Sequence, residues 1–372
     1  MKDLLEICCG MDVHKDMVVA CILKGSTDKE PKEEIREFST LSSGLRELKK
    51  WLESENCKDI AMESTGVYWF ALYCKLEEIT GANIIVTNPK HMKNVPGKKT
   101  DINDARWIAS LLRAGLLTSS YIPEKEIREL RDLTRYRKNI VEDISAQKNR
   151  IEKFLQQCGV KLSTFLTDIF GASGMSIIKS LYEKGTISED EVISHLHGAA
   201  KRKLDGIKLV VDCKLNAHQM EFLRMLVEWL AKYKEHLTEI EKKIEVKAYQ
   251  FNDVIEIVCT TPCIERTSAI IIISEIGAEL TKFKTAGHLC SWAGMCPGNN
   301  ESAGKKKSTK VNKGNNFIKN VLCQCSWAIT RHRKSFLHNW YWKIKQRRGC
   351  KKAIVALGRK LLTIIYNLIT KK

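Results

Sequence analysis

The first apolar run of the chain contains a carboxylate. Asp12 lies within Ile7–Val13, a run whose other residues are apolar or glycine and predict a buried β-strand. Burying an ionised carboxylate is unfavourable unless the group is paired, hydrogen-bonded or bound to a metal ion. Because side chains alternate between the two faces of a strand, Gly10, Asp12 and His14 share one face. The sequence therefore predicts a core strand that carries a functional acid.

Three further acids extend this prediction. Glu63 ends a second strand-like run, and Asp101 and Asp104 stand three residues apart at the start of a helix. Helical residues with this spacing point from one face. Hard divalent cations such as Mg²⁺ bind a few carboxylate oxygens and keep several waters for substrate phosphate. Asp12 and these three acids together predict metal-dependent phosphodiester chemistry, with Mg²⁺ or Mn²⁺ as the cofactor.

Each acid also has an ordinary interpretation. Asp101 follows Thr100, a good N-cap residue, and the helix dipole favours acids in a first turn. Glu63 at the end of a strand is equally well explained as a solvated residue. Asp12 has no such explanation, because it stands inside an apolar strand. The four acids together are a stronger indication of a site than any one of them.

Nearly all the excess positive charge lies towards the C-terminus. The formal net charge is +18, and no Asp or Glu follows Glu301, whereas 19 of the 62 Lys and Arg residues do. Basic residues interleaved with aromatic ones such as Trp340 and Trp342 favour nucleic acid as the partner over a solvated surface or an anionic membrane. The side chains predicted to bind nucleic acid are Lys305, Lys306, Lys307, Lys310, Lys313, Arg331, Arg333, Arg347 and Arg348.

Cysteine usage and the N-terminal residues predict a cytoplasmic protein. Lys2 and Asp3 interrupt the N-terminus, so no signal peptide is expected. Fourteen cysteines without an export signal indicate reduced thiols, and spacings such as Cys259/Cys263 miss the usual zinc patterns. Apolar stretches such as Ala269–Ile273 are too short to span a bilayer, so no membrane segment is expected.

Strand-like and helix-like segments alternate over the first 120 residues, which predicts an α/β layer with a largely covered sheet in a domain spanning residues 1–125. The expected strands are Ile7–Leu23 (broken by a turn), Glu34–Ser39, Asp59–Glu63 and Asn83–Thr87. The expected helices are Ser42–Glu53, Val67–Ile79 and Asp101–Leu116. A basic loop, Asn88–Thr100, leads to the last two acids.

Residues 126–250 follow a three-four spacing of apolar positions, as in Leu223, Leu226 and Leu230, with charged flanks. This pattern predicts long coiled-coil helices, and residues 158–215 between them form a smaller helical insert. The sequence leaves open whether the long helices pair with each other or with a second protomer.

Residues 251–372 form the expected C-terminal domain, which is mostly helical with one long loop, Gly294–Lys307. Ser302 lies in this loop between glycines and three lysines, and is therefore an exposed serine among phosphate-binding groups. The spacing of glycine and lysine excludes a Walker A loop.

Long residue strings at both ends of the chain match a known family. The N-terminal strings are Gly10-Met11-Asp12-Val13-His14-Lys15, Met62-Glu63-Ser64-Thr65-Gly66, Asn88-Pro89 and Lys99-Thr100-Asp101-Ile102-Asn103-Asp104-Ala105. The C-terminal strings are Ser291-Trp292-Ala293-Gly294, Pro297-Gly298-Asn299-Asn300-Glu301-Ser302-Ala303-Gly304-Lys305, Lys313-Gly314-Asn315 and Lys351-Lys352-Ala353-Ile354-Val355-Ala356. In order and spacing the chain resembles the DEDD-type transposases of the IS110 group of bacterial and archaeal insertion sequences.

This resemblance implies a RuvC-like, RNase H-like N-terminal domain, a coiled coil and a C-terminal transposase domain. By the same resemblance Asp12, Glu63, Asp101 and Asp104 bind the metal, and Ser302 is the nucleophile that becomes linked to DNA. The implied partners are element-end and target DNA, further protomers of a dimer or tetramer, and a structured guide RNA from the element. The implied location is the prokaryotic cytoplasm, at the nucleoid.

One segment departs from the family pattern. Members often carry Pro-Gly-Ile-Gly where this chain has Pro262-Cys263-Ile264-Glu265. Glycines there would suit a helix-hairpin-helix turn whose amides approach phosphate, whereas a cysteine side chain hinders the approach and Glu265 adds repulsion. We therefore expect this turn to be structural.

Two other functions are compatible with the residues. A RuvC-like endonuclease or junction resolvase would use the same four acids with water as the nucleophile, and Ser302 would then be dispensable. A non-catalytic nucleic-acid-binding protein would use only the basic C-terminal part and would tolerate Asp12→Asn. The resemblance favours the transposase.

Overall fold

The computed structural model divides the chain into two compact units, Met1–Ile122 and Pro123–Lys372. It describes residues 3–64, 66–88, 101–298, 300–302, 305–308 and 310–371. Within these ranges the side chains of residues 101, 102, 199, 300–302 and 305–308 lie outside the description. The division into three domains expected from the sequence stays a prediction.

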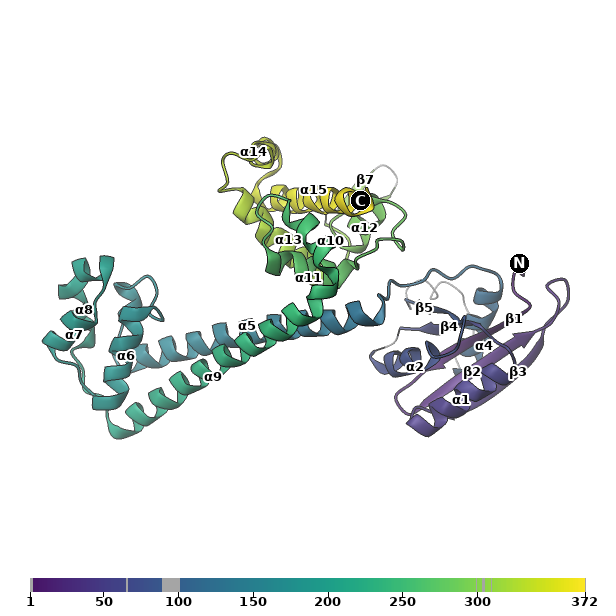
Figure 1. Cartoon of the computed structure of the whole chain (residues 1–372), viewed down its shortest axis with the longest axis horizontal. Helices are drawn as coiled ribbons and strands as arrows, with labels where there is room; N and C mark the ends of the chain where they lie inside the picture. Colours follow the sequence, from purple (N-terminus) through teal and green to yellow (C-terminus); the bar gives the residue numbers. More distant parts are fainter. Residues whose placement is uncertain are drawn as a thin grey trace. The chain divides into compact units, whose positions relative to one another are not determined.

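Five strands of the first unit form one mixed sheet in the order β3-β2-β1-β4-β5 (Figure 1). β1 (Ile7–Val13), β2 (Met17–Lys24) and β3 (Lys32–Ser39) are antiparallel neighbours. β4 (Asp59–Glu63) pairs parallel with β1, and β5 (Asn83–Thr87) pairs parallel with β4. This mixed sheet is RNase H-like, and it confirms the α/β fold class expected from the sequence.

Helices cover both faces of this sheet, which explains why β1 is apolar on both sides. On one face, Met11 packs in a core with α1 (Ser42–Ser54) and α2 (Tyr68–Leu76). On the other face, Cys8 packs in a second core with α4 (Asp101–Arg113). Asp12 has the same parity along β1 as Cys8, so its side chain points to the α4 face.

The outer edges of the sheet, formed by β3 and β5, differ in their surroundings. β3 carries exposed charged residues, among them Lys32, Glu33 and Glu37. At the other edge, the carbonyl of Val86 in β5 accepts a hydrogen bond of 2.7 Å from the backbone N–H of Ser120. The segment after α4 therefore occupies part of the β5 edge.

Two long helices dominate the second unit and pack antiparallel (Figure 1). They are α5 (Lys125–Gln157) and α9 (Ala217–Ala248). Near one end of the pair Arg137 Nη2 lies 2.6 Å from Glu241 Oε1, and further along Gln147 Nε2 donates to the Leu226 carbonyl at 2.8 Å. The two helices therefore pair with each other within the chain, which the sequence had left open.

Short helices connect α5 to α9 and share an apolar core with the adjoining ends of these two helices, around Ile177 and Leu181. These helices lie in the segment where the sequence predicts a smaller helical insert. In chain order its elements are η1 (Leu162–Thr164), α6 (Ala172–Lys184), α7 (Glu189–His195), η2 (Gly198–Lys203) and α8 (Leu204–Val211).

The rest of the second unit is mostly helical, as expected. Its helices are η3 (Tyr249–Phe251), α10 (Asn252–Cys259), α11 (Arg266–Ile276), α12 (Ala286–Trp292), α13 (Asn316–Ile329), α14 (Phe336–Arg348) and α15 (Cys350–Thr370). By length and composition, α15 is apolar enough to cross a membrane, with a mean hydropathy of 1.4. The sequence had indicated no such segment, because charged residues interrupt the apolar run. In this structure α15 is a core helix, because Leu357, Leu361 and Ile365 are fully buried among its neighbours α10, α12, α13 and α14.

Candidate active site

Asp12 and Glu63 stand side by side in the sheet. The parallel register of β1 and β4 pairs Met11 with Met62, and the two acids are the next residues along these strands. Ala61 packs in the core under α4, so Glu63, two residues on, faces α4 as Asp12 does. The two acids were predicted from separate strands. They share one face of the sheet, at the C-terminal ends of β1 and β4.

Helix α4 brings the other two predicted acids to the C-terminal ends of β1 and β4. The backbone N–H of Leu4 donates to the Arg113 carbonyl, and the Cys8 thiol donates to the Ala109 carbonyl. These two contacts show that α4 runs antiparallel to β1. A Cβ atom at Gly10 would lie 2.2 Å from the Ala109 nitrogen, so the helix rests directly on the strand there. One turn earlier, the first residues of α4 are level with Asp12.

Asp101 and Asp104 occupy that first turn. Asp104 is partly buried next to Ala105, which is fully buried, whereas the side chain of Asp101 lies outside the described residues. Residue 101 is four positions before Ala105 and therefore on the same face of the helix. The backbone thus brings all four predicted acidic positions to one end of the α4 face of the sheet.

Asp12 has a partner that the sequence analysis missed. Asp12 is only 7% exposed, and its Oδ2 lies 3.1 Å from Nε2 of His14. His14 is two positions on, so it shares the strand face with Asp12, and this spacing was the available signal. The His14 side chain is 44% exposed.

The donor set suits a hard divalent cation. Asp12, Glu63 and Asp104 offer only carboxylate oxygens, the ligands that Mg²⁺ and Mn²⁺ prefer. Among the side chains that the structure describes, no group of three His, Cys, Asp or Glu residues is close enough to hold a metal ion. The same row of the sheet also contains Thr87, whose buried hydroxyl oxygen has no hydrogen-bond partner within the described part of the chain. An unsatisfied polar atom beside two acids fits a site that is completed by a further group.

Ser302 lies in a β-hairpin where the sequence analysis expected a loop. β6 (Asn300–Ser302) and β7 (Lys305–Ser308) are antiparallel, and Ser302 pairs with Lys305. The stem continues through a bridge between Pro297 and Val311. Glycine and proline interrupt the helical pattern here, as the sequence indicates. The pairing of the two hairpin strands is made by the backbone and leaves little trace in the pattern of side chains. The side chain of Ser302 and those of Lys305–Lys307 lie outside the described residues.

Two glycines close the base of this hairpin. Gly294 has a φ of +69°, and a Cβ at Gly314 would lie 2.2 Å from the Gly294 nitrogen. Any side chain at residue 314 would therefore separate the two strands of the stem. Both glycines belong to the strings that carried the family resemblance.

Two family models match this chain. One describes the DEDD transposase of IS110 elements and covers residues 9–160, and the other describes the transposase IS116/IS110/IS902 family and covers residues 255–341. The chain belongs to the IS110 family of transposases. It is therefore an enzyme that catalyses phosphoryl transfer on DNA. The matched regions include all four predicted acids and the serine hairpin.

Individual relatives agree with this assignment. The transposase for insertion sequence element IS1111A of Coxiella burnetii is 24% identical over 320 residues, which are 84% of this chain and 78% of that protein. The transposase for insertion sequence element IS1533 of Leptospira borgpetersenii is 29% identical over 159 residues, which are 41% of this chain and 44% of that protein.

The predicted nucleic-acid-binding residues of the transposase are exposed where their side chains are described. Lys310, Lys313, Arg331, Arg333, Arg347 and Arg348 all reach solvent. On α14 the ammonium of Lys345 lies 3.9 Å from the ring centre of Trp342, which is 40% exposed. This mixture of cations and an exposed aromatic ring suits a nucleic-acid surface, and the assignment of the individual residues stays a prediction.

The departure from the family pattern has a backbone counterpart. Cys263 has a φ of +60°, a left-handed conformation in which glycine is usual. Its position is that of the first glycine in the Pro-Gly-Ile-Gly pattern, between α10 and α11. The chain therefore keeps the conformation of the turn while a side chain projects from it.

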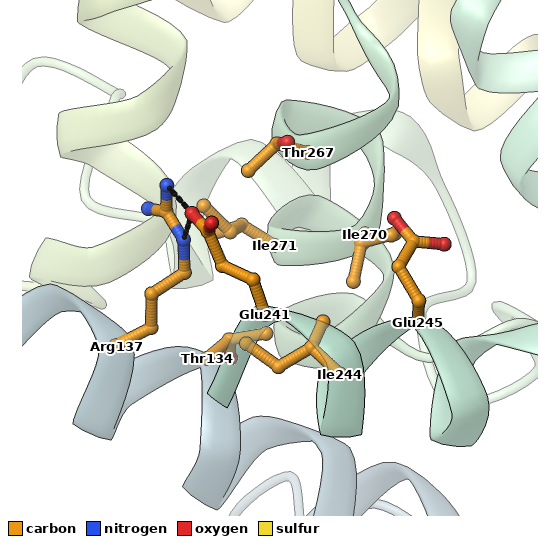
Figure 2. Close-up of a pocket in the computed structure, with 8 residues that line it drawn as sticks. All are labelled: Thr134, Arg137, Glu241, Ile244, Glu245, Thr267, Ile270 and Ile271. Atoms are coloured by element: carbon orange, nitrogen blue, oxygen red, sulfur yellow. Dashed lines mark hydrogen bonds and ion pairs between the residues drawn. The ribbon is translucent and has the colours of Figure 1, made fainter. Parts of the chain in front are cut away.

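A separate cavity of about 180 Å³ lies where α11 packs on the paired helices α5 and α9 (Figure 2). Arg137 and Glu241 form an ion pair at its wall, and Thr134, Ile244, Glu245, Thr267, Ile270 and Ile271 complete the lining. None of the predicted site residues lines this cavity, so we assign it no part in the chemistry.

Proposed function

We propose that this transposase cuts and rejoins the DNA of an insertion sequence through a metal-bound acidic quartet and a serine nucleophile. The quartet is Asp12, Glu63, Asp101 and Asp104, and the nucleophile is Ser302. The observation that carries the proposal is the row formed by Asp12 and Glu63 on the face that the start of α4 covers. Carboxylates are gathered on a covered sheet face where they are unfavourable without a cation.

A bound Mg²⁺ or Mn²⁺ would neutralise charge on the scissile phosphate and orient its in-line displacement. The carboxylates of Asp12 and Glu63 would hold the ion from two adjacent strands, which fixes their separation. His14 would hold the orientation of the Asp12 carboxylate through its Nε2 contact of 3.1 Å. Asp104 would complete the set from the helix.

Ser302 would attack phosphorus through its side-chain oxygen. A serine O–P bond forms, a phosphodiester P–O bond breaks, and the departing DNA strand ends in a hydroxyl that receives a proton. The serine hydroxyl must lose its proton in this step, and Asp101 or Asp104 is the proposed acceptor. The reverse attack by a DNA hydroxyl would release the serine and join the strand to a new partner.

The basic residues would hold the DNA on either side of this step. Lys305, Lys306 and Lys307 follow the serine directly and would bind flanking phosphates as point charges. Lys310, Lys313 and the exposed arginines of the C-terminal part would extend this contact. Kinship within the family supports two further proposals, which are assembly as a dimer or tetramer and pairing of donor and target by an element-encoded guide RNA.

The alternative is a RuvC-like endonuclease or junction resolvase with water as the nucleophile. It is kept because the acidic site alone accounts for metal-dependent hydrolysis, while the serine belongs to the other unit. In that case Ser302→Ala would cut DNA at nearly the wild-type rate and leave free ends.

Covalent trapping separates these functions. The full-length protein is incubated with labelled element-end DNA, RNA copurified from the native host and Mg²⁺, and then resolved on a denaturing gel. A DNA-linked protein band that disappears in Ser302→Ala and in Asp12→Asn is the expected result. Metal-dependent cutting without any adduct would reject the serine mechanism and leave the endonuclease.

A further inference from the structure

The hydroxyl of Thr87 is buried, and no hydrogen-bond partner for it lies among the residues that the structure describes. Thr87 ends β5 and is 0% exposed, and its Oγ1 is one of the buried polar atoms for which the structure shows no partner. A buried hydroxyl that lacks a partner is destabilising, and such groups in folded proteins require an explanation. Valine has the same shape and would fill this position without that penalty.

The sheet register places Thr87 beside Glu63. β4 and β5 are parallel, and Glu63 and Thr87 are direct partners across them. Ile85 packs against the core under α4, so Thr87, two residues on, has its side chain on that same face. Asp12, Glu63 and Thr87 therefore form one row across β1, β4 and β5.

We propose that Thr87 is a positioning residue of the acidic site, whose hydroxyl donates a hydrogen bond to the Glu63 carboxylate when that carboxylate holds the metal ion. This inference rests on the proposed function, because it needs Glu63 as a ligand. Neighbouring strands are about 4.8 Å apart, so a small rotation of the glutamate side chain brings its oxygen within reach of the hydroxyl.

The chemistry of the pair supports this assignment. A hydroxyl that donates to an ionised carboxylate makes a shorter and stronger hydrogen bond than it makes to a neutral acceptor. Carboxylates that bind metal ions are usually held by such outer partners, and loss of the partner typically weakens metal affinity 10- to 100-fold. Glu63 has several rotatable bonds, whereas branching at Cβ restricts χ1 of threonine, so Thr87 is the more rigid member of the pair.

The chain offers a matched control. Thr261 is 2% exposed in the second unit, and its Oγ1 also lacks a hydrogen-bond partner among the described residues. Thr87→Val and Thr261→Val therefore make the same chemical change at equally buried sites. Both should raise the melting temperature of the metal-free protein, but only Thr87→Val should change its response to metal.

The experiment follows the melting temperature of the full-length protein during titration with MnCl₂ or MgCl₂ alone. A ligand that binds only the folded state raises the melting temperature with its concentration. We expect Thr87→Val to need about tenfold more metal than the wild type for the same rise. Thr87→Ser, which keeps the hydroxyl, should show the wild-type dependence of the melting temperature on metal concentration. Thr261→Val should show the same metal-dependent rise as the wild type, from a higher starting temperature.

Each other outcome has a defined meaning. If Thr87→Val and the wild type titrate alike, while Asp12→Asn loses the rise, the metal site exists and the role of Thr87 is rejected. If the wild type shows no metal-dependent rise that Asp12→Asn removes, the metal site of the proposed function fails, and the inference about Thr87 fails with it.

Discussion

Gly10 decides how closely α4 approaches β1, the strand that carries Asp12. A Cβ there would meet the Ala109 nitrogen at 2.2 Å and the Ala105 carbonyl oxygen at 2.5 Å, both backbone atoms that cannot rotate away. We therefore expect Gly10→Ala to displace the helix and to lower the free energy of unfolding by about 3 kcal/mol. Because α4 carries Asp101 and Asp104, DNA cleavage should fall more than the loss of folded protein explains. Urea unfolding and a cleavage assay on the same preparation measure both.

Gly287 is the control for this substitution. A Cβ at that position in α12 would find only the Thr285 hydroxyl, at 3.5 Å, so Gly287→Ala should be neutral or stabilising by up to about 1 kcal/mol. Equal stability of Gly10→Ala and the wild type would show that the helix does not depend on this contact.

Single residues also show how far the sequence could be interpreted. Asp12 was identifiable because a charge in an apolar strand is exceptional, and Glu63 because it ends the next such strand. His14 and Thr87 were missed because a histidine near a turn and a threonine at a strand end are common. Their importance depends on register between strands, which the sequence does not display.

At the scale of elements, a buried carboxylate joins the long helix α5 to the C-terminal helices. Glu275 in α11 is 0% exposed and accepts hydrogen bonds of 2.8 and 2.9 Å from Arg135 in α5. Asn315, which caps α13 just after the serine hairpin, donates to the same carboxylate at 2.5 Å. Glu275→Gln should lower the free energy of unfolding by about 3 kcal/mol, because it removes the buried negative charge that Arg135 and Arg131 both face.

A second pair on α5 tests whether burial is the cause. Lys138 and Glu142 form an exposed i, i+4 pair, so Glu142→Gln should change the free energy of unfolding by no more than about 0.5 kcal/mol. Urea titrations of both variants provide the comparison. Similar small effects would mean that Arg135 is satisfied by its contact with the Phe317 ring, which lies 4.3 Å away, rather than by the carboxylate.

Elements differed in how well the sequence predicted them. The strands around the acids and the long helices were predicted, because periodic apolar positions define both. The serine hairpin was predicted as a loop, because Gly, Asn and Lys carry no strand periodicity. Its stem instead forms through backbone bonds, such as the one from Gly298 to the Lys310 carbonyl at 2.9 Å.

At the scale of the molecule, buried thiols make stability depend on alkaline pH. None of the fourteen cysteines, all of which the structure describes, forms a disulfide, and burial raises the pKa of Cys8, Cys21 and Cys57 from 9.0 to about 12. Between these values the unfolded chain releases thiol protons that the folded chain retains. The free energy of unfolding should therefore fall as pH rises from about 9 to about 12, by roughly 1 kcal/mol per pH unit for each thiol.

Replacing the thiols isolates their share of this dependence. Cys57→Ala removes one group that titrates differently in the two states, so its loss of stability between pH 9 and 11 should be shallower than that of the wild type. Chemical unfolding at a series of pH values measures the slope, and Cys296→Ala, at a position that is only partly buried, is the control. Identical slopes for Cys57→Ala and the wild type would contradict the prediction.

The two edges of the sheet bear on how this enzyme can associate. An uncovered strand edge recruits strands from other chains, and charged side chains or a covering segment prevent it. Here β3 presents charges along one edge, and the backbone of Ser120 caps part of the other. Two copies of the transposase are thus hindered from pairing their sheets edge to edge. Any contact between copies is then left to surfaces other than these two strand edges.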